Sequence, residues 1–391
     1  MGLEVAILWQ DTLFLSVTTQ LFVSMKLVKS LFLIPLIMSQ LAVGQTQSTQ
    51  ATITIQLDFE SAKAIIELLG KSKASDTELI QIAKLYGSQQ LIRKVSNYDK
   101  SGTEATFKQT LQEVVETGTV KGHDPFDWKL VKSNSVAIRQ LIQQLETKQT
   151  FVDDVKALIL PYTPANIMTT IRACFLVGGG SLGFTVGNDN TFNVALQKIG
   201  DDYEGLMYLV AHELYHSIQS VGEHSRVKQK TANDPPKPIV NAYTLLANLW
   251  AEGSATLVGD FTNVKAPKAF TKIAQEEYTR NGDRTRQNFA LFESLLFSAF
   301  YDSTANMGEL YNIGFTTAYD ETSYYAGYRM AKVIEKYKGR QALADCVNKD
   351  ALEFCQLYVS IYKAHPNDPI IRFSASTEAI ITKVEPWKNK L

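Results

Sequence analysis

Two histidines and a glutamate at helical spacing are the residues of this chain best suited to chemistry. They are His212, Glu213 and His216, in the pattern His-Glu-x-x-His within the apolar stretch 204–220. Four residues turn an α-helix by about 400° and advance it by about 6 Å, so both imidazoles lie on one face and can bind one metal ion. Glu213 is placed to take a proton from a water molecule beside that metal. The alternative, a helix with two core histidines, accounts less well for the apolar setting.

A third protein ligand is expected further along the chain. A catalytic zinc ion usually has three protein ligands and one position for water. In one longer form of this motif, a glycine and then a third histidine follow the second histidine. That form is absent here, because Gln219 and Gly222 occupy the positions of the glycine and the third histidine. Glu252 is the better candidate, because it lies on the next strongly apolar segment, where a carboxylate needs a partner. The alternative is that Glu252 is a solvated helix residue.

The neighbours of Glu252 suggest how its helix is placed. Gly253 and Ala255 are small enough to allow close approach to the histidine helix. Asp260 is a candidate for a carboxylate that orients a ligand imidazole. Three other acidic residues compete for that role: Asp201, Asp202 and Glu204.

These motifs resemble those of the gluzincins, zinc metallopeptidases in which a ligand Glu follows the His-Glu-x-x-His motif on a later helix. The whole chain resembles a family of exported bacterial proteins described as zinc-dependent peptidases. The resemblance rests on three segments: 212–216, 251–255 and 324–331. It implies one zinc ion held by His212, His216 and Glu252, with Glu213 as the general base. The well-studied gluzincins carry an acidic residue four positions after the ligand Glu, and here that position is Thr256.

The third segment contains tyrosines that could assist catalysis. Thr322 or Ser323 is expected to cap a helix that ends at Gly339. Tyr325 and Tyr328 are three residues apart and share a face near the start of that helix. A phenol there could stabilise the oxyanion that forms when water attacks a carbonyl. The alternative is that both tyrosines are core aromatics.

Hydrophobic periodicity predicts the elements that position these residues. Apolar residues recur at helical spacing in five N-terminal segments: 59–69, 76–85, 104–116, 130–146 and 151–160. Strand patterns follow at 167–177, 182–186 and 191–196, and residues 187–190 between the last two have a hairpin-turn composition. Helical patterns return from residue 204, with an irregular linker over 221–238.

These elements predict a mainly helical α+β fold that is zincin-like. A small antiparallel sheet over 167–196 is expected directly before the His-Glu-x-x-His helix. We expect a helical N-terminal part over 45–165 and a catalytic part over 166–391, with active-site helices at 204–220 and 239–260 and further helices after them.

The first residues have the pattern of a leader. Residues 25–44 combine two lysines, an apolar run and small residues before a cleavage point after Gly44, as in a signal peptide. We expect translation to begin at Met25, which makes residues 1–24 an untranslated upstream extension. A membrane helix is the weaker alternative, because acidic residues and a proline interrupt the apolar stretches. An exported protein without a stable membrane anchor after cleavage is therefore expected.

Composition limits the remaining possibilities. The 391 residues are 45% hydrophobic, which excludes a disordered chain. Lys and Arg number 39 against 40 Asp and Glu, so no overall charge favours binding to nucleic acid. Cys346 and Cys355 are close enough in sequence for a disulfide bridge, whereas Cys174 is expected to be a buried apolar residue.

The predicted function is hydrolysis of peptide bonds in a peptide or protein substrate by an exported zinc metallopeptidase. A sheet edge before the metal-binding helix could pair with an extended peptide. Two alternatives stay open. One is an exported binding module with a structural or vestigial metal site, although structural zinc usually has four protein ligands, often Cys. The other is a zinc hydrolase that acts on a non-peptide amide or ester.

Overall fold

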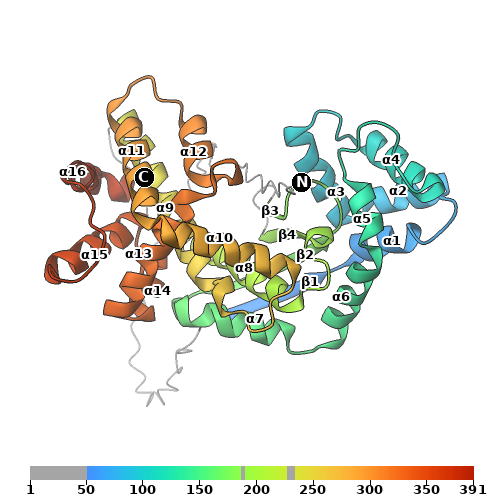
Figure 1. Ribbon diagram of the computed structural model, residues 1–391, viewed down its shortest axis with the longest axis horizontal. Helices are drawn as coiled ribbons and strands as arrows, with labels where there is room; N and C mark the ends of the chain where they lie inside the picture. Colours follow the sequence, from blue (N-terminus) through green and yellow to red (C-terminus); the bar gives the residue numbers. More distant parts are fainter. Residues whose placement is uncertain (1–50, 186–189, 227–233) are drawn as a thin grey trace, which may run out of the picture.

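The computed structural model describes residues 51–185, 190–226 and 234–391 (Figure 1). Its strands are β1 (Thr52–Asp58), β2 (Met168–Leu176), β3 (Gly183–Phe184) and β4 (Thr191–Ala195). The helices before the His-Glu-x-x-His segment are α1 (Glu60–Leu68), α2 (Asp76–Lys84), α3 (Tyr86–Tyr98), α4 (Glu104–Thr117), α5 (Trp128–Ser133), α6 (Ser135–Thr147) and α7 (Phe151–Ile159). The later helices are α8 (Tyr203–Ser225), α9 (Lys237–Val258), α10 (Ala269–Asp283), α11 (Thr285–Tyr301), α12 (Met307–Phe315), α13 (Thr322–Lys338), α14 (Arg340–Asn348), α15 (Ala351–Ala364) and α16 (Ala375–Val384).

The fold is mainly helical with one small sheet, as the hydrophobic pattern predicts. The predicted segment 130–146 is two helices, α5 and α6, which are separated at Asn134. Helix α3 was not predicted, because it falls between the predicted helical segments 76–85 and 104–116, and a glycine, Gly87, follows the first of them after one intervening residue. Gly87 lies in the first turn of α3, where an added Cβ would lie 2.2 Å from Ser61 Oγ of α1. This glycine serves close packing between two helices rather than helix termination.

The sheet is mixed, so the prediction of an antiparallel sheet was wrong. Its strand order is β1-β2-β4-β3; β2 pairs in parallel with both β1 and β4, and β3 pairs antiparallel with β4. The run Ala173–Val177 in and after β2 is buried throughout. A continuous apolar run of this kind is typical of a parallel strand that is covered on both faces. Only the β3–β4 pairing has the predicted hairpin direction, and most of its turn lies outside the described residues.

Strand β1 was missed, and it joins the two predicted parts of the chain. Its residues alternate between exposed threonines and buried isoleucines, which is the period expected of a strand with one buried face. It pairs with β2 in the register Thr52 to Met168. The N-terminal part therefore contributes an edge strand to the sheet of the following part.

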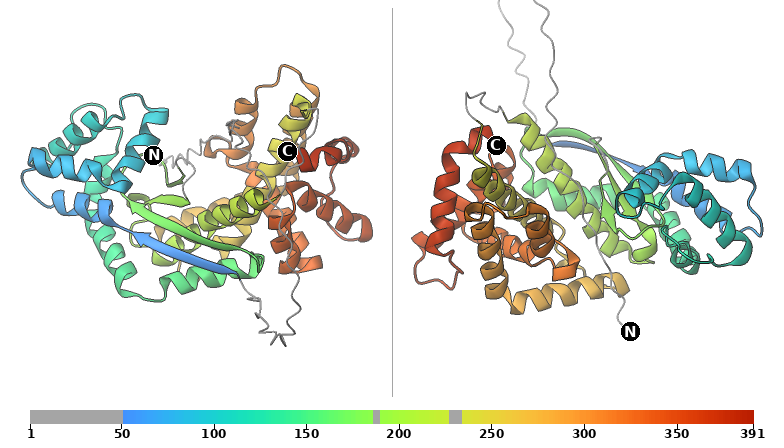
Figure 2. Two further views of the ribbon diagram at one scale, coloured as in Figure 1. Left: turned by 180° about the vertical axis from the view of Figure 1, so that it is seen from behind. Right: turned by 90° about the horizontal axis from the view of Figure 1, so that it is seen from above.

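The His-Glu-x-x-His helix, α8, lies between this sheet and the C-terminal helices (Figures 1 and 2). Helix α8 packs on β2, β4 and α7, and α9 packs against α8. Helix α13 in turn packs against α9. Asp202 caps α8 by accepting a hydrogen bond from the Gly205 N–H at 2.9 Å. These contacts fix the two helices from which the candidate ligands project.

The three cysteines are buried thiols that form no disulfide. The bridge between Cys346 and Cys355 is therefore not formed, and Cys174 is buried as expected. Within the described ranges, no helix has the length and apolar character needed to span a membrane. The predicted signal peptide at 25–44 lies outside the described residues.

Candidate metal centre

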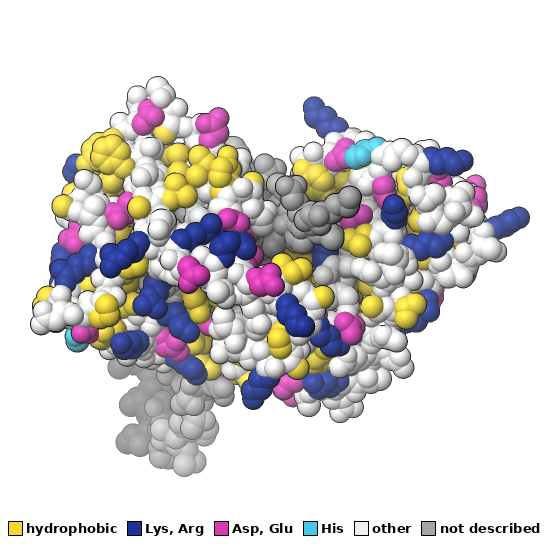
Figure 3. Space-filling view, viewed as in Figure 1, with side chains coloured by type: hydrophobic (Ala, Val, Ile, Leu, Met, Phe, Trp, Pro, Cys, Tyr) yellow, Lys and Arg dark blue, Asp and Glu magenta, His cyan; other side chains and the backbone are white. Residues whose placement is uncertain are grey.

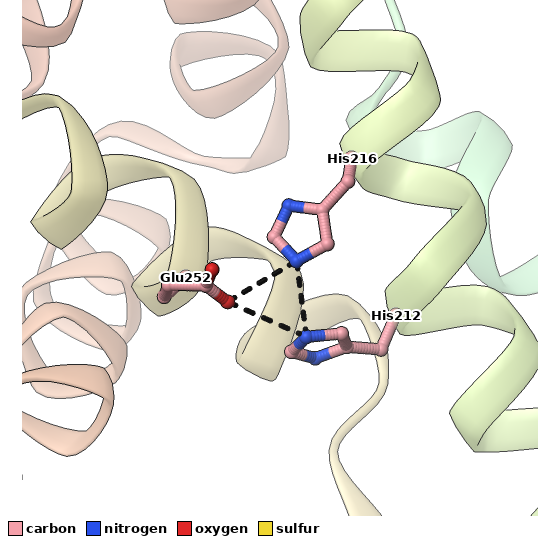
Figure 4. Close-up of side chains that lie close together, drawn as sticks. All are labelled: His212, His216 and Glu252. Carbon is pink, nitrogen blue, oxygen red and sulfur yellow. Dashed lines mark hydrogen bonds and ion pairs between the residues drawn. The ribbon is translucent and has the colours of Figure 1, made fainter. Parts of the chain in front are cut away.

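Three side chains from two packed helices converge on one point (Figure 4). His212 and His216 project from α8, and their Nε2 atoms are 3.1 Å apart. Glu252 projects from α9, and its Oε2 lies 3.1 Å from His216 Nε2 and 3.6 Å from His212 Nε2. All three side chains are largely buried. The structure thus brings together the three residues that the sequence identified as candidate ligands.

The separations of these atoms fit a tetrahedral zinc ion. Zinc binds imidazole nitrogen and carboxylate oxygen at about 2.0–2.2 Å, so adjacent tetrahedral ligand atoms lie about 3.3 Å apart. The three observed separations lie on either side of that value. Glu252 Oε2 is buried, and it pairs with the two imidazole Nε2 atoms. A buried carboxylate oxygen that faces two imidazoles is suited to a metal ion, so the donor set fits zinc.

Gln219 holds His216 in place. Its Oε1 lies 3.0 Å from His216 Nδ1, so it can accept the proton of that nitrogen and leave Nε2 free for a metal. Its Nε2 donates to Ala251 O at 3.1 Å and to Ser254 Oγ at 2.8 Å. Both acceptors flank Glu252 on α9. One amide therefore links the helix of the histidines to the helix of the glutamate.

His212 has a different partner. Its ring makes a hydrogen bond with the backbone of Ala255, one turn beyond Glu252. Gly259 at the end of α9 allows this approach, because an added Cβ there would lie 2.7 Å from the Cβ of His212. Each candidate histidine is thus oriented by α9.

Burial and mutual charge determine the protonation of the cluster. Burial lowers the pKa of His212. Burial would also lower the pKa of His216, but the charge of Glu252 raises that pKa to about 9. Burial would raise the pKa of Glu252, but the two imidazoles lower it to about 2. The cluster therefore favours an ionised Glu252, which is the form that binds a cation.

Glu213 lies beside the cluster without a partner. It is 2% exposed, and its Oε1 makes no hydrogen bond within the described part of the chain. Burial raises its pKa to about 8. An added Cβ on Gly183 of β3 would lie 2.6 Å from that oxygen, so only glycine fits beside the carboxylate. The edge strand of the sheet is thus in close contact with the predicted general base.

A cavity of about 400 Å³ opens beside these residues. Its wall includes His212, Glu213 and Thr256, together with residues of α10 and the start of α13. Its volume lies in the range of small-molecule sites, about 300–1,000 Å³. Thr256 occupies the position at which the gluzincins have an acidic residue, and its buried Oγ1 has no partner in the described structure.

Tyr325 and Tyr328, the two tyrosines predicted to assist catalysis, interact with acidic side chains. Tyr328 donates a hydrogen bond to Asp260 Oδ2 at 2.7 Å, and Tyr325 makes a hydrogen bond with Glu277. Both rings pack edge-on against Tyr278. The ring beside the candidate ligands belongs to Tyr324, which is parallel to that of His212 at a centroid separation of 6.4 Å. One helical position, about 100° of rotation, separates Tyr324 from the predicted Tyr325.

The acidic residues considered as partners of the ligand imidazoles have other roles. Asp260 accepts hydrogen bonds from Thr262 and Tyr328, and Asp202 caps α8. Glu204 accepts the N–H groups of residues 265 and 266, and Asp201 pairs with Lys268. Gln219 orients His216 instead. It is three residues from His216 on the same helix face, so the spacing alone could have identified it.

The fold and the cluster define an α+β protein in which two histidines and one glutamate form a largely buried cluster suited to a metal ion. The chain belongs to the family described as "Putative zinc dependent peptidase (DUF5700)", which matches residues 79–367. That range contains all the residues of the candidate centre. Neither the curated proteins nor the solved structures include a match.

Proposed function

We propose that this protein is an exported zinc metallopeptidase. The observation that carries the proposal is the convergence of His212, His216 and Glu252 beside an unpartnered Glu213 at the wall of a cavity. Membership of a family described as zinc-dependent peptidases supports the same chemistry.

The residues of the candidate centre have different roles in the proposed reaction. Zinc, held by His212, His216 and Glu252, supplies the Lewis acidity that activates water and polarises a carbonyl. Glu213 takes a proton from the attacking water as the new carbon–oxygen bond forms. It then gives that proton to the amide nitrogen as the carbon–nitrogen bond breaks, so the same carboxylate serves as base and acid.

Tyr324 is the residue that we propose to stabilise the oxyanion, in place of the predicted Tyr325 and Tyr328. Its side chain is 4% exposed, it lines the cavity, and its hydroxyl has no partner among the described residues. A free phenol beside a ligand imidazole can donate to the oxygen that gains charge during the attack. The hydroxyls of Tyr325 and Tyr328 are already engaged with Glu277 and Asp260.

The position of the sheet edge favours a peptide as the substrate. β3 is at one end of the strand order and contacts Glu213 through Gly183. An extended peptide that paired with this edge would place its backbone beside the general base.

Replacing Glu213 by Gln tests the proposal. The amide keeps the shape of the side chain but cannot take a proton, so we expect unchanged zinc content and a loss of peptide hydrolysis of at least about 10²-fold. Zinc content is measured on the purified protein, and hydrolysis with casein and a peptide library, with and without a chelator. Full activity in Glu213→Gln would contradict the mechanism. A zinc-loaded wild-type protein that hydrolyses no peptide would favour the structural-metal alternative.

Export is a separate part of the proposal. The sequence supports cleavage after Gly44, and a chain that starts at Gln45 retains all of β1. Expression of the gene with its natural start in a bacterial host, followed by N-terminal sequencing, checks this. We expect the mature protein outside the cytoplasm with Gln45 as its first residue. A cytoplasmic protein that keeps residues 25–44 would contradict export.

A further inference from the structure

A second pair of acidic residues lines the same cavity. Glu277 projects from α10, and Glu321 lies in the turn just before α13. Their carboxyl groups interact electrostatically with each other, and Glu277 also interacts with the hydroxyl of Tyr325. The mechanism proposed above uses neither residue.

Glu321 has an oxygen without a partner. The residue is 7% exposed, and its Oε1 makes no hydrogen bond within the described ranges. Burial of a polar atom without a hydrogen bond is unfavourable, and such atoms are uncommon in folded proteins. Because Glu321 lines the cavity, a ligand in the cavity can supply the missing donor.

The backbone before α13 is held in a rare conformation that presents Glu321. Asp320 and Glu321 have φ angles of 60° and 49°, in the left-handed region that L-residues seldom adopt. Arg284 donates to Asp320 Oδ2 at 2.8 Å, Arg280 pairs with Oδ1 at 3.3 Å, and the Glu321 N–H donates to Thr316 O at 3.0 Å. Backbone strain of this kind is concentrated at functional sites.

The charge of Arg280 acts on Glu277, but no Lys or Arg among the described residues forms a salt bridge with Glu277 or Glu321. Arg280 and Arg284 are the partners of Asp320. Lys198 is the only Lys or Arg among the described residues that line the cavity, and its Nζ donates to the carbonyl of Gly180. The cavity therefore presents more acidic than basic groups.

The rest of the wall suits an aliphatic chain. It includes five apolar side chains from three segments: Leu209, Phe261, Phe270, Ile273 and Ala274. A lysine or arginine side chain combines an apolar stem with a cationic end. Such a side chain matches a cavity that has apolar walls and a pair of acids.

We propose that Glu277 and Glu321 bind a cationic nitrogen of the substrate and so make the peptidase selective for basic peptides. This inference rests on the proposed peptidase function. The nitrogen belongs either to a lysine or arginine side chain or to the free N-terminal amine of a peptide, since both present the same chemistry to the acids.

The protonation of the pair agrees with this role. Burial and the neighbouring Glu277 raise the pKa of Glu321, and burial raises the pKa of Glu277. A bound cation would offset both effects. A second metal ion is the less suitable occupant, because the described residues contain one group of three or more candidate metal ligands, which is the centre itself.

Binding to the Glu213→Gln protein tests the inference without turnover. The probes are N-acetylated, C-amidated alanine hexapeptides with a single Lys at each position in turn, and matched peptides with norleucine. We expect at least one Lys peptide to bind about tenfold or more tightly than its norleucine partner. A parallel set with free N-termini identifies the terminal amine as the source if acetylation removes the preference.

Substitutions then locate the cation site. Glu277→Gln and Glu321→Gln, each combined with Glu213→Gln, should each reduce the preference by at least about fivefold. Glu276→Gln is the matched control, because Glu276 precedes Glu277 on α10, is exposed and does not line this cavity. Equal binding of Lys and norleucine peptides, or a preference that survives both substitutions, would overturn the inference.

The two proposals can fail separately. If the wild-type protein hydrolyses peptides without regard to charge, the cation site is wrong and the peptidase function stands. If it hydrolyses no peptide while the Glu213→Gln protein binds cationic peptides through Glu277 and Glu321, the peptidase function is wrong and the binding site stands.

Discussion

At the scale of single residues, orientation of the metal ligands depends on an amide rather than a carboxylate. The amide oxygen of Gln219 faces His216. Its amide nitrogen donates to the Ala251 carbonyl and the Ser254 hydroxyl on either side of Glu252. It is 4% exposed, so water cannot readily replace these hydrogen bonds. Gln219 is therefore a positioning residue for both sides of the candidate centre.

Gln219→Leu should weaken zinc binding. Leucine fills the space but cannot accept the proton of His216 Nδ1, and loss of such a partner typically lowers metal affinity by about 10–100-fold. Competition with a chromophoric chelator measures the change in zinc affinity independently of turnover. Ser220→Ala is the control, because Ser220 is exposed on the same helix and its hydroxyl makes a hydrogen bond only with His224 among the described residues. Unchanged zinc affinity in Gln219→Leu would contradict this role.

Some residues of the site can be predicted from the sequence and others cannot. The spacing of His212, Glu213 and His216 within one helix specifies their relative positions. The position of Tyr324 depends on how α13 is rotated against its neighbours, and two tyrosines of equal chemical suitability stand within four residues of it. Glu277 and Glu321 meet only through tertiary packing, so no local pattern could have paired them.

At the scale of elements, the crossing of α9 and α13 sets the distance between Glu252 and Tyr324. Gly253 and Gly327 meet at this crossing, where an added Cβ on Gly327 would lie 2.2 Å from Leu249 O and 2.8 Å from the Cα of Gly253. The sequence predicted that Gly253 would allow close approach to α8. The close approach is instead to α13, because Gly253 lies on a different face of α9 from the one that contacts His212.

Gly327→Ala should therefore disturb both stability and the site. The nearest atoms are backbone, which cannot move aside easily, so we expect a loss of about 1–3 kcal/mol in the free energy of unfolding and weaker zinc binding. Denaturant unfolding and chelator competition measure the two effects. Gly282→Ala is the matched control, because a Cβ there meets nothing within 4 Å, and alanine should leave stability equal or higher. A stable Gly327→Ala protein with normal zinc affinity would show that the crossing does not set the site.

The errors in the predicted sheet have a physical cause at this same scale. The direction of a strand depends on its partners, and β1 is separated from β2 by seven helices in the sequence. Alternation within residues 52–58 could have identified β1 as a strand, but not its parallel pairing with β2. The hydrophobic pattern of a segment indicates which of its residues are buried. It does not by itself indicate which strands pair with each other.

At the scale of the whole molecule, charge is balanced overall and unbalanced at the site. The net charge is −1, and Figure 3 shows acidic and basic side chains mixed across one face. The cavity, in contrast, is lined by Glu213, Glu277 and Glu321, and the charge of Glu252 also acts on Glu213 and Glu321. Selectivity for a charged substrate would therefore come from the cavity rather than from the surface.

This concentration of buried acids should make stability depend on pH. Folding raises the pKa of Glu321 above its ordinary value of 4.5, through burial and the charges of Glu277, Glu252 and Asp320. A carboxyl group with a raised pKa in the folded state binds protons more tightly there than in the unfolded state. Its stabilising contribution is complete below pH 4.5 and is lost as the pH rises through the folded-state pKa.

Glu321→Gln should remove this dependence in the metal-free protein. The amide cannot ionise, so the variant should gain in Tm relative to wild type at pH 8, by about 1–4 °C, and gain less at pH 5, where the wild-type carboxyl is more protonated. Thermal unfolding in the presence of a chelator, at both pH values, measures the difference. Glu276→Gln, on the exposed face of α10, should change Tm equally at the two pH values. A Tm difference for Glu321→Gln that is the same at pH 5 and pH 8 would mean that Glu321 is not held as a buried, destabilising acid in the folded protein.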